Sequence, residues 1–275
     1  MKKKKILKIK LAITAICVLI LCFTFIDGNA SGKTIENFST VSNIYIYSPN
    51  TEITAHRGYS INAKENTLNA FKKAKEAGAK WIELDVRKTK DNVIVVSHDD
   101  NLKRVFKKNL IIKNTKYSVL KKYNIPTLKE SLKLAKDYDL HVNIELKEAG
   151  YEKEIIKIVN ELDLKSNVVI TSFNYDALKN VEKLDSSFTT LFTVGSTKNV
   201  DKYNKVDGYS VLFTGTSKEK IEELHNQGKI VYLWTVDRKI SLQKAFTMGA
   251  DNIITNRVED AFDVLNDMTY VYTTH

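Results

Sequence analysis

The sequence has little cysteine and little proline. Its 275 residues contain two cysteines, Cys17 and Cys22, and both lie within one apolar run near the N-terminus. The rest of the chain therefore has neither disulfides nor thiol chemistry, and its stability has to come from a hydrophobic core. Only two prolines occur, Pro49 and Pro126, and no Ser/Gly-rich linker divides the chain. The length after the apolar run suits one large domain or two small ones, and the lack of breaks favours one.

The folded part also lacks a large basic excess. The chain carries 43 Lys+Arg against 33 Asp+Glu, a formal net charge of +10, but its first ten residues contain six lysines and no acidic residue. Without these six charges, residues 11–275 carry a net charge of only +4. A nucleic-acid-binding module clusters its basic residues on the folded domain, so we expect no nucleic-acid partner.

The basic N-terminus is followed by a segment typical of export. The uncharged apolar run Leu11–Ile26 precedes Asp27 and the small residues 28–31. With a cut after Ala30 this pattern describes a signal peptide, whereas a retained run would anchor the chain in the membrane. Both alternatives leave the lysines on the cytoplasmic side. We therefore expect an exported protein, extracellular or anchored to the outer side of the cell membrane, with membrane contact through residues 1–30.

The remaining chain alternates short β-rich runs with helical patterns. Residues 31–50 are polar and without a clear period, which predicts a spacer. Eight strands are predicted after it: Glu52–Ala55, Trp81–Val86, His141–Leu146, Val168–Thr171, Thr189–Val194, Gly208–Phe213, Ile230–Thr235 and Asn252–Thr255. Strands that alternate with helices indicate a parallel sheet. The pattern favours an α/β fold, a (β/α)8 TIM barrel over residues 51–267, with a seven-unit variant as the alternative and residues 268–275 as a tail.

Helices are predicted between most of these strands. They begin at or next to Thr67, Thr127, Tyr151, Tyr175, Ser217 and Arg238. Residues 196–206, between the fifth and sixth strands, are too few for more than one helical turn. After the second strand, the extra run Val93–Val96 and the stretch Asp99–Ile125 delay the next helix. This short insertion is expected at the C-terminal mouth of the barrel, where such folds build their active sites.

Three acidic residues stand on two neighbouring predicted strands. Glu83 and Asp85 are two residues apart and point to the same face of one strand, and Glu145 and Lys147 do the same on the next. Inside a barrel, three carboxylates would repel one another and be costly to desolvate. A divalent cation resolves this, and oxygen ligands suit Ca²⁺ or Mg²⁺ better than zinc. The alternative is a structural network in which Arg57 and Lys147 neutralise the carboxylates.

Two histidines are expected in the same region. His56 follows the first strand and His98 follows the extra run. They suit a general acid and a general base on either side of a phosphorus centre, with Arg57 and Lys147 as cations that bind the phosphate. The other histidines lie at the start of a strand, late in a helix and at the chain end: His141, His225 and His275.

These residues belong to a longer series of motifs. In chain order the motifs are His56-Arg57-Gly58, Glu65-Asn66-Thr67, Glu83-Leu84-Asp85, Asp91, His98-Asp99 with Leu102 and Arg104, Ile125-Pro126-Thr127-Leu128, Asn143-Ile144-Glu145-Leu146-Lys147, Ser172-Phe173, Trp234-Thr235-Val236, Gly249-Ala250-Asp251 and Thr255-Asn256. Over about residues 52–262 the series strongly resembles the glycerophosphodiester phosphodiesterases, which have a phospholipase C-like phosphodiesterase barrel.

The resemblance implies a metal-dependent hydrolase that converts glycerophosphodiesters into sn-glycerol 3-phosphate and an alcohol. It implies an acid–base pair, three ligands of one divalent cation (Ca²⁺ or Mg²⁺) and two phosphate-binding cations: His56 and His98; Glu83, Asp85 and Glu145; and Arg57 and Lys147. Trp234 would line an apolar wall for the substrate. In the family's usual mechanism the neighbouring glycerol hydroxyl attacks phosphorus while one histidine removes its proton. The other histidine protonates the leaving alcohol, and water then opens the cyclic phosphate.

The sequence departs from the family pattern near the expected mouth. Lys64 stands where a proline commonly precedes the Glu-Asn-Thr motif, and Val105 and Phe106 stand where threonines are frequent. The segment Asp99–Ile125 is short and rich in lysine. These changes leave substrate identity open among simple diesters, lysophospholipids and glycerol-phosphate wall polymers. An enzyme that stops at the cyclic phosphate and a non-catalytic surface-binding module are the further alternatives.

Overall fold

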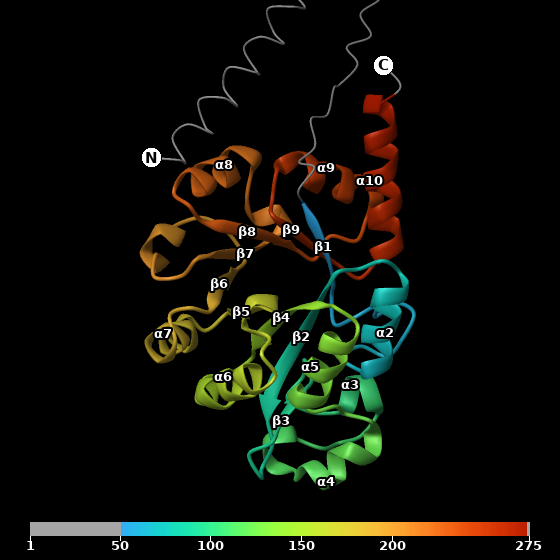
Figure 1. The fold of residues 1–275 in the computed structure, drawn as a ribbon, viewed down its shortest axis with the longest axis vertical. Helices are drawn as coiled ribbons and strands as arrows, with labels where there is room; N and C mark the ends of the chain where they lie inside the picture. The colour runs from blue at the N-terminus through green and yellow to red at the C-terminus, as the bar shows by residue number, and fades with distance from the viewer. Residues whose placement is uncertain (1–50, 274–275) are drawn as a thin grey trace, which may run out of the picture. The chain divides into compact units, whose positions relative to one another are not determined.

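The computed structural model describes residues 51–273 (Figure 1). The predicted export segment in residues 1–30 and the predicted spacer in residues 31–50 lie outside the described residues. Within residues 51–273, no helix combines the length and the apolar character that a membrane span needs.

The described residues form a closed barrel of eight parallel strands. The strands are β1 (Glu52–Ala55), β2 (Trp81–Lys88), β4 (His141–Leu146), β5 (Val168–Ser172), β6 (Thr189–Val194), β7 (Gly208–Leu212), β8 (Ile230–Trp234) and β9 (Asn252–Thr255). Strand β1 pairs with both β9 and β2, which closes the sheet. The predicted eight-stranded barrel is confirmed. The extra run forms β3 (Ile94–Val96), which pairs with β2 in the antiparallel sense.

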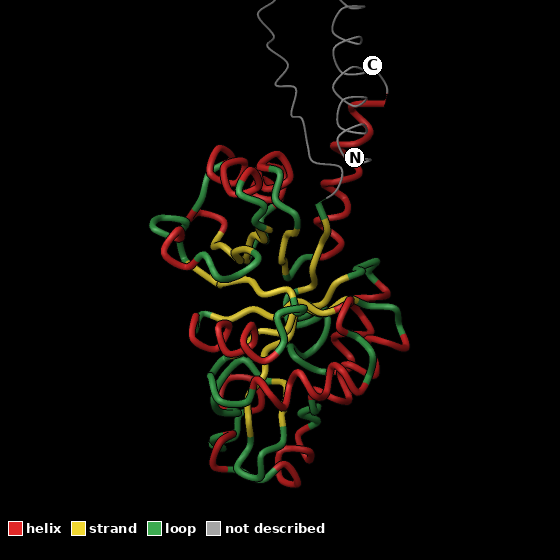
Figure 2. The backbone as a smooth tube through the Cα atoms, turned by 60° about the vertical axis from the view of Figure 1, so that its left-hand side comes forward, coloured by secondary structure: helices red, strands yellow, loops and turns green. Residues whose placement is uncertain are grey.

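Helices surround these strands on the outside (Figures 1 and 2). They are α2 (Leu68–Glu76), α5 (Leu128–Asp137), α6 (Glu152–Glu161), α7 (Tyr175–Leu184), α8 (Lys218–Asn226), α9 (Lys239–Met248) and α10 (Val258–Thr273). Between β6 and β7 the described chain makes only the short 3₁₀ turn Val200–Tyr203, as the length of that segment predicts. Helix α10 was not among the predicted helices, and it continues past residue 267 to Thr273.

The sequence explains where these helices begin and which face they bury. The Thr67 side chain accepts a hydrogen bond from the Ala70 N–H at the start of α2, and Thr127 forms a capping box with Glu130 at the start of α5. Such caps satisfy N–H groups that have no partner within the helix. Helix α2 buries Phe71 against the sheet, so local capping and apolar spacing act together to place the helix.

The interior of the barrel is apolar toward the N-terminal ends of the strands and carries polar side chains toward their C-terminal ends. Val169, Leu191, Tyr232 and Ile254 form a buried cluster inside the sheet. Because side chains alternate along a strand, the inward residues two positions after Val169, Leu191 and Tyr232 are Thr171, Thr193 and Trp234. The apolar layer therefore fills the barrel toward the N-terminal ends of the strands, and a polar cavity forms only at their C-terminal ends.

The insertion after β3 has a small core of its own. It contains α3 (Lys103–Phe106), η1 (Ile112–Asn114), α4 (Tyr117–Leu120) and η2 (Lys121–Tyr123). Leu102, Ile112, Leu120 and Ile125 of the insertion are buried together with Val95 of β3. The insertion is packed as a unit that follows the β2–β3 hairpin (Figure 1), so it brings a defined surface to the mouth of the barrel.

Candidate active site

A polar cavity of about 140 Å³ lies at the C-terminal ends of the strands. The predicted residues His56, Arg57, Glu83, His98, Glu145, Lys147 and Trp234 all line it. Two larger hollows, of about 500 and 780 Å³, lie beside the insertion and contain neither the histidines nor the carboxylates. The predicted histidines and carboxylates, rather than the cavity volume, therefore identify the small cavity as the candidate active site.

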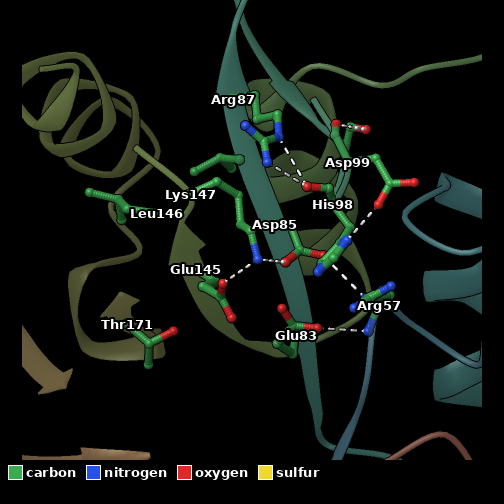
Figure 3. Close-up of polar contacts among 12 residues, drawn as sticks. Arg57, Glu83, Asp85, Arg87, His98, Asp99, Glu145, Leu146, Lys147 and Thr171 are labelled. Atoms are coloured by element: carbon green, nitrogen blue, oxygen red, sulfur yellow. Dashed lines mark hydrogen bonds and ion pairs between the residues drawn. The ribbon is translucent and has the colours of Figure 1, made fainter. Parts of the chain in front are cut away.

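The three predicted acidic ligands converge beside this cavity (Figure 3). Glu83, Asp85 and Glu145 each offer one oxygen, and these oxygens lie within 4.8 Å of one another. The Lys147 ammonium lies 3.3 Å from Asp85 Oδ1 and 2.5 Å from Glu145 Oε1. The Arg57 main-chain N–H donates to Glu83 Oε2 at 2.8 Å. Since the Arg57 guanidinium also lies near Asp85, both predicted cations contact the carboxylates, as in the ion-pair alternative.

These ion pairs do not satisfy the whole cluster. Glu83 Oε1 is buried and has no hydrogen-bond partner. Burial, together with the charges of Asp85 and Glu145, raises the pKa of Glu83 well above its usual value. Three carboxylates face two cations, so one negative charge is left without a counterion among the described residues. The cluster fits a divalent cation, because such an ion would supply that charge and a partner for the orphaned oxygen.

A tight turn after β1 brings Arg57 to the cluster. Arg57 has a φ of 57° and Gly58 a φ of 76°, values that favour glycine. A Cβ on Gly58 would lie 2.7 Å from the Ala70 carbonyl carbon, too close for any side chain. The turn points the Arg57 N–H toward Glu83 and places the Arg57 Nε 3.4 Å from Asp85 Oδ2. Local backbone geometry therefore explains the glycine of the His-Arg-Gly motif.

His56 is held by an amide and not by a carboxylate. Its Nδ1 lies 2.8 Å from Asn256 Oδ1, and the Asn256 side-chain amide donates to Asp237 at 2.8 Å. Because Asn256 Oδ1 can only accept, the His56 Nδ1 carries the proton and Nε2 keeps its lone pair. That Nε2 lies 3.9 Å from Glu83 Oε2. Burial lowers the pKa of His56, which keeps the ring neutral and available as a base.

His98 is held by charged partners on two sides. Its Nδ1 lies 2.7 Å from Asp99 Oδ1, and its main-chain oxygen accepts from Arg87 Nε at 3.0 Å and Nη2 at 2.8 Å (Figure 3). Burial lowers the pKa of the His98 ring, although the charge of Asp85 and the hydrogen bond to Asp99 oppose this shift. The Nδ1 contact leaves Nε2 as the nitrogen that can exchange a proton with a substrate.

Two aromatic residues, Phe173 after β5 and Trp234 at the end of β8, pack together beside the cavity. Trp234 donates from its indole N–H to the Ser210 carbonyl at 3.0 Å and packs edge-to-face on Phe173, with ring centroids 5.5 Å apart. Phe173 is 52% exposed, so it stands at the mouth. His141 stacks on Trp81 at the other end of the barrel and His225 pairs with Asp251, as expected for residues outside the site.

Several residues of the site had no role in the sequence prediction. Asp237, Arg87, Thr193 and Ser210 were not named as functional, although Thr193 and Ser210 line the cavity. Asp237 directly follows the Trp234-Thr235-Val236 motif, and Thr193 and Ser210 follow the inward alternation of their strands. These positions in the sequence were the signals from which a role at the site could have been predicted. Glu65, Asp99, Arg104 and Asn256 belonged to motifs without an assigned function, and the structure gives all four charged or polar contacts at the site.

Comparison with known proteins agrees with this geometry. Residues 56–260 match the model of the glycerophosphoryl diester phosphodiesterase family. A glycerophosphodiester phosphodiesterase of Caldanaerobacter subterraneus is 33% identical in an alignment of 237 residues, which covers 78% of this chain and 98% of the relative.

Solved structures give the same result. The glycerophosphodiester phosphodiesterase of Thermotoga maritima superposes with a TM-score of 0.68 at 30% identity and covers 78% of this chain and 98% of its own. An Oleispira antarctica phosphodiesterase solved with its product sn-glycerol-3-phosphate has a TM-score of 0.69 at 25% identity and covers 78% and 96%. The chain therefore belongs to the glycerophosphoryl diester phosphodiesterase family and is an enzyme, a phosphoric diester hydrolase.

Proposed function

We propose that the chain hydrolyses glycerophosphodiesters to sn-glycerol 3-phosphate and an alcohol, with one bound divalent cation and acid–base catalysis by His56 and His98. The observation that carries this proposal is the convergence of both histidines on one cavity that also holds the three-carboxylate cluster. The product of the Oleispira relative supports the choice of substrate. A non-catalytic binding module would need neither the pair of histidines nor the three-carboxylate cluster.

Glu83, Asp85 and Glu145 are the proposed ligands of the cation, which is Ca²⁺ or Mg²⁺. When bound, the cation supplies positive charge that offsets the negative charge developing on the phosphoryl oxygens. Asn66 supports the ligands, because its side-chain amide donates to Asp85 Oδ2 at 2.8 Å. This contact fixes one oxygen of Asp85 and leaves the other toward Lys147.

Arg57 and Lys147 are the proposed phosphate-binding cations. Both side chains are largely buried, with 17% and 13% exposure, and both border the cavity. A guanidinium can give two parallel hydrogen bonds to phosphate oxygens, whereas an ammonium acts as a point charge. Together they would hold the diester so that its phosphorus lies between the two histidines.

The two histidines differ in a way that suggests their roles. The His56 side chain is 19% exposed and the His98 side chain is 34% exposed. His56, the deeper residue, would remove the proton from the attacking glycerol hydroxyl through its free Nε2. His98, nearer to solvent, would act as the imidazolium paired with Asp99 and give its Nε2 proton to the alcohol as it leaves. After the cyclic phosphate forms, the roles reverse and water opens the ring.

We also propose that the chain acts outside the cell membrane. The basic N-terminus and the apolar run that follows it support export. Fractionation of cells that produce the full-length chain tests this point, because recovery with the cytoplasm would contradict export.

Product identification tests the proposed reaction. The purified chain is incubated with glycerophosphocholine, a lysophospholipid and a poly(glycerol phosphate), and the products are separated by mass and by ³¹P NMR. We expect sn-glycerol 3-phosphate and choline from the first substrate. A stable cyclic phosphate with no free glycerol phosphate would contradict hydrolysis, and preference for either of the other substrates would assign a different natural substrate.

A further inference from the structure

One arginine of the insertion, Arg104, lies between the carboxylates of Asp99 and Glu65. The Arg104 Nε donates to Asp99 Oδ2 at 2.7 Å and Nη2 donates to Asp99 Oδ1 at 3.2 Å. On its other side, Nη1 donates to Glu65 Oε2 at 2.7 Å and Nη2 donates to Glu65 Oε1 at 2.6 Å. The guanidinium is thus bidentate toward both carboxylates, which fixes their planes as well as their positions.

Each of these carboxylates contacts a residue of the proposed reaction. Asp99 Oδ1 also lies 2.7 Å from the Nδ1 of His98. Glu65 Oε1 also accepts from Arg57 Nη1 at 3.0 Å. One continuous chain of contacts therefore runs from His98 through Asp99, Arg104 and Glu65 to Arg57. It joins the insertion to the loop between β1 and α2, and Lys64 adds a second contact there by lying 4.6 Å from the centre of the Phe106 ring.

The donors of Arg104 are already used. Four of its five N–H groups are committed to Asp99 and Glu65, so little remains for a phosphate. Partial burial raises the pKa of Glu65 and of Asp99, but the hydrogen bonds from Arg104, together with the contacts and charges of Arg57 at Glu65 and of His98 at Asp99, outweigh it and lower both pKa values. Both acids are therefore charged acceptors at neutral pH.

We propose that Arg104 is a positioning residue, which holds Asp99 against His98 and Glu65 against Arg57 and so orients the histidine and the phosphate-binding arginine together. The roles of His98 and Arg57 rest on the proposed function. Without Arg104, Asp99 is free to turn toward solvent, because its side chain is 22% exposed. His98 would then lose the partner that accepts from its Nδ1–H and keeps Nε2 directed toward the substrate.

The two bidentate contacts of Arg104, an arm to Asp99 and an arm to Glu65, should affect different kinetic constants. Loss of the Asp99 arm acts on proton transfer and should lower kcat, whereas loss of the Glu65 arm acts on phosphate binding and should raise KM. A residue that only stabilised the insertion would not affect kcat through one contact and KM through the other. Lysine cannot replace the double bidentate contact, because it has a single nitrogen.

The experiment uses the full-length chain with glycerophosphocholine. We expect Asp99→Asn to lower kcat by about 10- to 100-fold with little change in KM, and Glu65→Gln to raise KM by about tenfold. Arg104→Met should show both changes, Arg104→Lys should recover little, and the Arg104→Met/Asp99→Asn double variant should have no lower kcat than Arg104→Met alone. Lys129→Met is the matched control, since Lys129 is equally exposed (49%) and pairs with Glu161 away from the site.

Two further readouts keep the outcome decisive. Wild-type kcat and KM in Arg104→Met would overturn the proposal, and so would an equal loss in Lys129→Met. The ¹⁵N shifts of the His98 ring test the same contact without turnover, and we expect Arg104→Met to change the Nδ1 shift because the hydrogen bond to Asp99 is lost. If the wild type hydrolyses no diester, the proposed function fails, and unchanged His98 shifts in Arg104→Met would then overturn the positioning role separately.

Discussion

The Nδ1 of His98 lies 2.7 Å from Oδ1 of Asp99, its neighbour in the sequence. The equivalent nitrogen of His56 faces an amide oxygen, that of Asn256, at 2.8 Å. A carboxylate partner stabilises a charged imidazolium more than an amide does. The site therefore contains one histidine with a carboxylate partner near solvent and one deeper histidine with an amide partner, an asymmetry that suits a general acid and a general base.

The leaving group separates the two histidines. We expect His56→Ala to lower kcat by about 10² or more with any diester, because a base is needed for every substrate. His98→Ala should cause a similar loss with glycerophosphocholine but a much smaller one with a 4-nitrophenyl diester of glycerol, whose leaving group needs no proton. Steady-state rates with both substrates measure this difference. The reverse pattern would exchange the two roles.

The orphaned oxygen of Glu83 predicts a strong effect on cation binding. Glu83→Gln removes one ligand charge from the cluster, so we expect the affinity for Ca²⁺ or Mg²⁺ to fall by at least about tenfold, as measured by calorimetry. Glu161→Gln, on the exposed face of α6, serves as the control. Equal affinity in wild type and Glu83→Gln would show that the cluster is only a structural ion-pair network.

An unpaired hydroxyl that lines the cavity, that of Thr193, predicts a substrate contact. Thr193 Oγ1 is buried without a partner, so Thr193→Val should keep or raise the free energy of unfolding, by about 1 kcal/mol at most. If that hydroxyl binds a glycerol hydroxyl, KM rises by about two- to tenfold.

Another threonine of β6 supplies the control for Thr193. Thr190 lies on the same strand, and its hydroxyl donates to Glu182 at 2.8 Å. Thr190→Val should therefore lower the free energy of unfolding and leave KM unchanged. Unchanged KM in Thr193→Val would exclude the substrate contact.

Acid should erase the stability that Arg104 contributes. Asp99 and Glu65 have lowered pKa values in the folded state, so their stabilisation is fully present above their unfolded pKa values, near pH 4, and is lost as the pH falls through the folded ones. We expect wild type to be more stable than Arg104→Met by about 1 kcal/mol or less at pH 7, because Arg104 is half exposed. Urea unfolding should show this difference vanish toward pH 2, and a difference that grows in acid would contradict the assignment.

Most of the barrel could be predicted from alternation along the sequence. The strand ends differ where a tertiary contact decides them. The prediction ended the second strand at Val86, whereas β2 continues to Lys88 because Lys88 pairs with Ile94 of β3. Helix α10 was overlooked although Val258, Ala261 and Val264 have helical spacing and are buried. Periodicity therefore gave the elements, and pairing between them set their bounds.

The site was only partly predictable, for a different physical reason. The spacing of Glu83 and Asp85 indicated a shared face, and the motifs indicated the histidines. The partners that set the state of each histidine could not be derived from spacing. His56 and Asn256 are 200 residues apart in the chain, and Glu65 and Arg104 meet only because the insertion folds back onto the first loop. Contacts of this kind depend on closure of the barrel.

The most direct test of the account is the release of sn-glycerol 3-phosphate from glycerophosphocholine by wild type and His56→Ala, each measured before chelation, after chelation, and after Ca²⁺ or Mg²⁺ is added back. We expect wild-type release to disappear with chelator and to return with one of the two cations, and His56→Ala to stay at least about 10² slower throughout. Full activity in chelator, or wild-type activity in His56→Ala, would contradict the account.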